Sequence, residues 1–161
     1  MLDNIGQVAR DLGQLEEAQN VFRENLDIRR QLRAKRGDLP EVLRDLSISL
    51  DNLGRVALAL GEREEARDAF RESLGIFRQL RTQVGDTPQT LRDLSIALDN
   101  VGTVARDLGR LKEARAAFTE CVTIRQRLAT AFPENEDFRN LLNAAQLRLS
   151  EVASISSSTT Q

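Results

Sequence analysis

The pentapeptide LDNLG at residues 50–54 decides the fold, because it recurs at a constant spacing. Related pentapeptides, LDNIG at 2–6 and LDNVG at 98–102, lie 48 residues before and after it. Between the segments 2–49 and 50–97, 29 of 48 positions are identical without a gap. A fixed period that runs through connections as well as apolar stretches indicates an array of duplicated structural units.

Each unit has the pattern of two helices of roughly 20 residues. Apolar residues from Leu91 to Leu108 recur at spacings of three and four, which is typical of one helical face. Gly109 ends this pattern, and a second helical stretch runs from Leu111 to about Ala131. Glycine and proline mark the borders between units, in the segments 37–40 and 85–88.

Six glycines fall into two sets with different predicted purposes. Gly6, Gly54 and Gly102 lie inside helical patterns, where glycine costs about 1 kcal/mol relative to alanine. We expect them to allow the partner helix of the same hairpin to approach closely. The second set is predicted to end the first helices in a left-handed conformation, and it consists of Gly13, Gly61 and Gly109.

The small and large residues of this array resemble the tetratricopeptide repeat signature. The series is Leu98, Gly102, Ala105, Gly109, Ala114 and Phe118, with counterparts from Leu50 to Phe70 and from Leu2 to Phe22. The period of 48 departs from the usual 34 and implies lengthened helices. An asparagine immediately before the apolar–small pair is similar to kinesin light chain-type repeats. The resemblance implies an all-α fold, a right-handed αα superhelix of three helical hairpins plus a C-terminal capping helix.

We expect one repeat domain over residues 1–153, with repeats at about 2–37, 40–85 and 88–132. An apolar stripe from Phe138 to Val152 predicts the capping helix at 136–153. The Ser/Thr-rich residues 154–161 are predicted to be a disordered tail. The first unit starts halfway along its first helix, so we interpret the chain as a fragment of a larger multidomain protein.

Composition argues against most catalytic classes. The chain has 161 residues, no histidine and one cysteine, so no catalytic residue, metal site or cofactor is predicted. Cys121 is interpreted as a small packed residue. With 23 basic and 25 acidic residues, the formal net charge is −2, which argues against nucleic-acid binding. No long apolar run and no signal peptide is present, so we expect a cytoplasmic protein without membrane contact.

The predicted binding residues are the asparagines Asn4, Asn52 and Asn100, which recur at one position of the first helices. One hypothesis is that each amide only bonds to a neighbouring helix. The other is that first helices line a concave surface, where an amide can donate to and accept from a peptide main chain. The resemblance to kinesin light chain-type repeats implies the second hypothesis. On the same face we expect Asp51, Asp99, Arg55, Thr103 and Arg106 to select ligand side chains.

The sequence therefore predicts a non-enzymatic protein-interaction module whose concave face binds a peptide or partner helix. The alternative is an architectural spacer or self-association segment of a bacterial signalling protein. Exposed apolar ends of an array could also support a homodimer.

Overall fold

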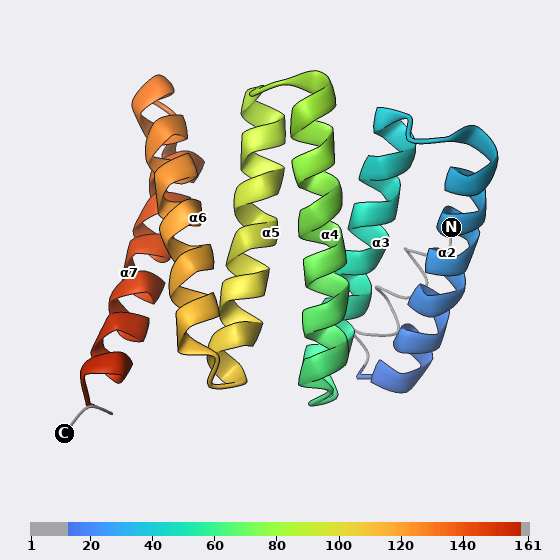
Figure 1. Ribbon diagram of the computed structural model, residues 1–161, viewed down its shortest axis with the longest axis horizontal. Coiled ribbons are helices and arrows are strands. Elements are labelled where there is room, and N and C mark those ends of the chain that lie inside the picture. Colours follow the sequence, from blue (N-terminus) through green and yellow to red (C-terminus); the bar gives the residue numbers. More distant parts are fainter. Residues whose placement is uncertain (1–12, 159–161) are drawn as a thin grey trace. The chain divides into compact units, whose positions relative to one another are not determined.

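The predicted helices are present and no strand accompanies them in the computed structural model, which describes residues 13–158. Six helices run in chain order (Figure 1): α2 (Leu15–Arg36), α3 (Pro40–Ala59), α4 (Arg63–Val84), α5 (Pro88–Asp107), α6 (Leu111–Ala131) and α7 (Glu136–Ser158). Their lengths of 20–23 residues confirm the prediction of elongated helices. The fold is all-α.

The turns form where the glycines predict them. Gly61 and Gly109 adopt φ of 82° and 70°, in the left-handed region that favours glycine. After each of them the chain reverses into the second helix of its hairpin. Pro88 opens α5 at its first position, and the Thr87 hydroxyl accepts a hydrogen bond from the Thr90 amide at 3.1 Å. Helix boundaries are thus determined locally.

The chain divides into two compact units between Val84 and Gly85. In the first unit, α3 packs against both α2 and α4. In the second unit, α6 packs against both α5 and α7. Each unit thus buries the apolar stripe of a central helix against two neighbours.

The helical glycines each face a phenylalanine ring of the partner helix. A Cβ added to Gly54 would lie 2.5 Å from Cε1 of Phe70, and one added to Gly102 would lie 2.6 Å from Cε1 of Phe118. Both rings are fully buried. The prediction of close approach within the hairpin is confirmed at both positions, and Gly6 lies outside the described residues.

Helix α7 begins at residue 136, as the apolar stripe predicts, but it continues beyond 153. Asn135 Oδ1 caps it by accepting a hydrogen bond from the Phe138 amide at 3.1 Å. Residues 154–158 are helical rather than part of a disordered tail. The physical reason is burial close to this end, since Val152 is fully buried in a cluster with Ala105 and Phe118.

Candidate functional site

Asn52 and Asn100 lie in the middle of α3 and α5, one in each unit, and both side chains are half-buried. Neither makes a side-chain hydrogen bond to any residue that the structure describes, and the Nδ2 atom of Asn100 is buried without a partner there. A buried donor without a partner costs roughly 1–3 kcal/mol. The described contacts therefore give these amides no role in holding neighbouring helices together. Asn4 lies outside the described residues.

Asp99 is engaged within the second unit. Its Oδ2 atom accepts from Arg125 Nη2 at 3.3 Å and makes a very short contact with Arg148 Nη1 of α7. Arg125 is 1% exposed, and it also donates to the Ser95 hydroxyl and to the Leu141 carbonyl at 2.9 Å. The Asp99 carboxylate therefore neutralises a buried cation between α5, α6 and α7.

The remaining predicted binding residues differ in exposure and in their contacts. Arg55 is exposed one turn after Asn52, and Thr103 is half-buried one turn after Asn100. Asp51 is buried. Arg106 forms ion pairs with Asp107 at 3.1 Å and with Glu151 of α7 at 3.2 Å. When the buried and ion-paired residues are set aside, two pairs of predicted binding residues remain, each on its own helix. These pairs are Asn52 with Arg55 and Asn100 with Thr103.

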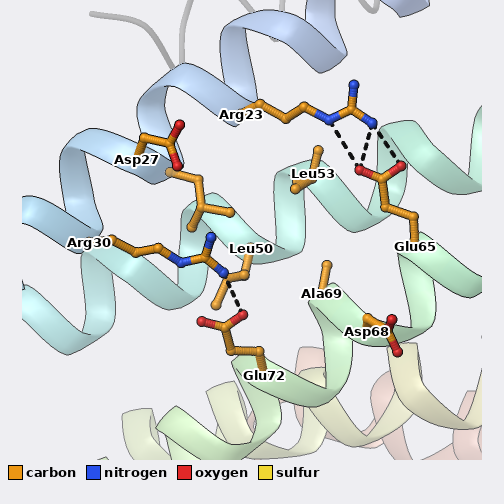
Figure 2. A pocket seen from close by; sticks show the side chains of 10 residues that line it. Arg23, Asp27, Arg30, Leu50, Leu53, Glu65, Asp68, Ala69 and Glu72 are labelled. Carbon is orange, nitrogen blue, oxygen red and sulfur yellow. Dashed lines mark hydrogen bonds and ion pairs between the residues drawn. The ribbon is translucent and has the colours of Figure 1, made fainter.

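A hollow of about 330 Å³ in the first unit was not predicted from the sequence. It lies between α2 and α4, above α3 (Figure 2). Its floor consists of buried apolar side chains, namely Leu26, Leu50, Leu53 and Ala69. We call this feature the α2–α4 groove.

Two ion pairs cross the α2–α4 groove. Arg23 Nη2 lies 2.7 Å from Glu65 Oε1, and Arg30 Nη2 lies 2.7 Å from Glu72 Oε2. The pairs are seven residues apart on each helix, which is about 10 Å along the helix axis. Both involve side chains that are one third to one half exposed. They frame the groove, and each contributes at most about 1 kcal/mol.

Between these ion pairs, an aspartate lies on each helix. Asp27 of α2 forms no ion pair or hydrogen bond within residues 13–158, because the arginines on both sides of it contact glutamates of α4 instead (Figure 2). Asp68 of α4 has its own neighbour Arg67 at 3.6 Å and a side chain that is 77% exposed. The groove therefore combines an apolar floor with an excess of negative charge.

The basic run of α2 does not form a separate cationic patch. Arg29 contacts Asp45, Arg30 contacts Glu72, and Arg33 donates to Asp38 at 2.6 Å. Arg36 lies 3.9 Å from Glu41. The arginines between residues 29 and 36 of α2 therefore lie on a helix face with acidic neighbours.

Cys121 has the packing role predicted for it. The side chain is fully buried, and its thiol donates to the Ser95 carbonyl at 3.2 Å. Burial raises the pKa of the thiol to about 12, which opposes formation of the nucleophilic thiolate. Among the described residues, no cluster of three or more acidic, histidine or cysteine side chains is placed to hold a metal ion. Nor does any of the helices described there combine the length and apolar character needed to cross a membrane.

Comparison with known proteins matches the array to one family. Residues 1–79 and residues 96–129 match two sequence models that are both described as tetratricopeptide repeat. No curated protein matches the chain. A solved structure titled "MamA RS-1 ArsTM double mutant" is 16% identical, and its alignment covers 98% of this chain and 95% of that chain with a TM-score of 0.33.

Proposed function

Because the chain belongs to the tetratricopeptide repeat family, we propose that it binds a peptide or partner helix through Asn52 and Asn100. Repeats of this family mediate protein–protein interaction, which is a non-catalytic function. In the proposed mechanism each amide donates to and accepts from the ligand main chain. Arg55 and Thr103, one helical turn further along, contact ligand side chains.

The observation that carries this proposal is the lack of a hydrogen bond to either amide among the residues that the structure describes. Asparagine is a mediocre helix former, so a mid-helix asparagine without a structural bond needs another explanation. Asp99 and Arg106 fit a binding role less well, because both already form ion pairs with neighbouring side chains. The proposal therefore rests on four residues, Asn52, Arg55, Asn100 and Thr103.

A peptide library selected on the immobilised chain provides the test. The dissociation constant of an enriched peptide is measured by fluorescence anisotropy for the wild type and for the Asn52→Ala/Asn100→Ala double variant. We expect the double variant to bind at least about tenfold more weakly, because each lost main-chain hydrogen bond contributes roughly 1 kcal/mol. Asn143→Ala, an exposed asparagine of α7, is the matched control and should bind like the wild type.

Thermal unfolding distinguishes a binding role from a structural one. Asn100→Ala removes a buried donor that has no described partner, so the variant should be at least as stable as the wild type. Destabilisation by more than about 1 kcal/mol would assign the amide to the fold. A selection that enriches no peptide, or a double variant with an unchanged dissociation constant, contradicts the proposed function.

A further inference from the structure

The α2–α4 groove carries more negative charge than its own ion pairs neutralise. Four carboxylates and two arginines line it, namely Asp27, Glu65, Asp68, Glu72, Arg23 and Arg30. The two arginines are both engaged by glutamates. Asp68 has Arg67 of its own helix at 3.6 Å and Asp27 has no ion-pair partner within residues 13–158, so the residues that line the groove keep a surplus of negative charge.

The repeats provide an internal comparison for these two aspartates. At the position of Asp27 the following units have Gly75 and Thr123. At the position of Asp68 the preceding unit has Asn20 and the following unit has Ala116. These equivalents also lie in helices of the same array, and none of them carries a carboxylate. The helical fold therefore does not require an acid at either position.

The chemistry of the groove restricts what can occupy it. An apolar helix would bury the charged rim, which is costly without compensating partners. A lysine or arginine side chain matches both parts, because its aliphatic stem covers apolar surface while its charged end stays near carboxylates. At about 330 Å³ the hollow is at the lower end of the roughly 300–1,000 Å³ typical of ligand pockets. This volume suits a side chain better than a whole peptide segment.

We infer that the α2–α4 groove binds a lysine or arginine side chain of a partner protein. The stem lies over Leu50, Leu53 and Ala69, and the cation lies at the rim close to Asp27, which has no ion-pair partner within residues 13–158. The two ion pairs, Arg23–Glu65 and Arg30–Glu72, border this position along the helices. This contact is separate from the asparagine residues of the proposed function, since neither asparagine lines the groove.

The test uses NMR titration of the full chain with two blocked peptides, acetyl-Ala-Ala-Arg-Ala-Ala-amide and the same peptide with citrulline in place of arginine. Citrulline keeps the shape of arginine and removes its charge. We expect the arginine peptide to shift the methyl signals of Leu50 and Leu53 saturably. Its affinity should exceed that of the citrulline peptide by about fivefold, because each exposed ion pair contributes up to about 1 kcal/mol.

Two double variants separate the local contact from overall charge. Asp27→Thr/Asp68→Ala introduces the residues that the third repeat carries and should lower the affinity for the arginine peptide to that for the citrulline peptide. Glu24→Ala/Glu134→Ala removes the same net charge at exposed positions outside the groove and should bind like the wild type. Circular dichroism establishes that both variants keep their helices.

Three results would overturn the inference. Equal affinities for the arginine and citrulline peptides would show that charge is not recognised. Unchanged binding by the folded Asp27→Thr/Asp68→Ala variant would place the contact elsewhere. Free spermidine binding more than tenfold tighter than the arginine peptide would identify a small polyamine as the occupant. Asn52→Ala/Asn100→Ala should leave these titrations unchanged, so failure of the proposed function is measured separately.

Discussion

At the scale of single residues, the same amino acid serves opposite purposes in this chain. Gly102 is required because the ring of Phe118 occupies the space of a side chain. Gly75 lies in the middle of α4, where an added Cβ would meet nothing within 4 Å. The surroundings, rather than the residue type, therefore decide whether glycine stabilises or destabilises a helix here.

The two glycines should respond to alanine with opposite signs. Gly102→Ala should lower the free energy of unfolding by about 1–3 kcal/mol, because the new Cβ overlaps a fully buried ring. Gly75→Ala should raise it by about 0.5–1 kcal/mol through better helix propensity. Urea denaturation followed by circular dichroism measures both changes. Stabilisation by Gly102→Ala would mean that the ring can move aside at little cost.

The carboxyl group of Asp38 provides a prediction for pH dependence. Its hydrogen bonds from Arg33 and then from Gln79 hold its pKa below the ordinary value for aspartate. A pKa that is lower in the folded state stabilises the fold above the ordinary aspartate range, and this contribution is lost as the pH falls through the lowered value. We expect an NMR titration to place the Asp38 midpoint below that of an unstructured aspartate. Arg33→Gln should move the midpoint back upward, and an unchanged midpoint would contradict the assigned cause.

At the scale of elements, α7 follows the sequence pattern of a first helix and packs against α6, the second helix of the preceding hairpin. The sequence of α7 aligns with that of α5 at the spacing of 48. The buried residues of α7 are Phe138, Leu142, Ala145 and Val152, and the corresponding residues of α5 are Thr90, Leu94, Ala97 and Val104. The α5 face with Leu91, Ser95 and Leu98 corresponds in α7 to exposed polar residues, Arg139, Asn143 and Gln146. A polar outer face is what a terminal helix of an array requires for solubility.

The position of α7 depends on the charge cluster around Asp99. Asp99→Ala should destabilise the protein by about 2–4 kcal/mol, because it leaves the buried Arg125 guanidinium without its carboxylate. Asp107→Ala removes an exposed aspartate that pairs with Arg106 and should cost less than about 1 kcal/mol. The urea midpoints of the two variants measure this difference. Equal midpoints would mean that the cluster contributes no more than a surface ion pair.

At the scale of the whole molecule, each of the two compact units keeps the sequence repeat while using its polar residues differently. In the first unit, Arg29 of α2 contacts Asp45, and Ser49 donates to Asn25 at 2.9 Å. In the second unit, the residues 96 positions after Asn25 and Ser49 are Cys121 and Ala145, and the equivalent of Arg29 is the buried Arg125. Similar backbones thus support different polar interiors, so the partner of a buried polar side chain cannot be transferred from one repeat to the next by position alone.

The sequence by itself determined the helices, the turns and the hairpin contacts, because these depend on short-range properties. Glycine at Gly61 and Gly109 allows the left-handed turn, and the small residue at Gly54 or Gly102 repeats with the phenylalanine sixteen positions later. The packing role of Cys121 followed from its equivalents in the other repeats. The end of α7 was missed, since Ser-rich residues alone indicate a tail and only the burial of Val152 against α5 and α6 shows where the helix is anchored.

Only the tertiary structure decided which charged residues the fold itself uses. Asp99 belongs to the same sequence pattern as Asp51, but its partners Arg125 and Arg148 lie 26 and 49 residues away. Asp27 and Asp68 depart from the repeat, which was a detectable signal, but the fact that both line one groove depends on how α2 and α4 pack. Charged side chains are long and have several partners within reach, so local periodicity cannot determine which ion pair forms. The distances between the packed helices determine which ion pair forms.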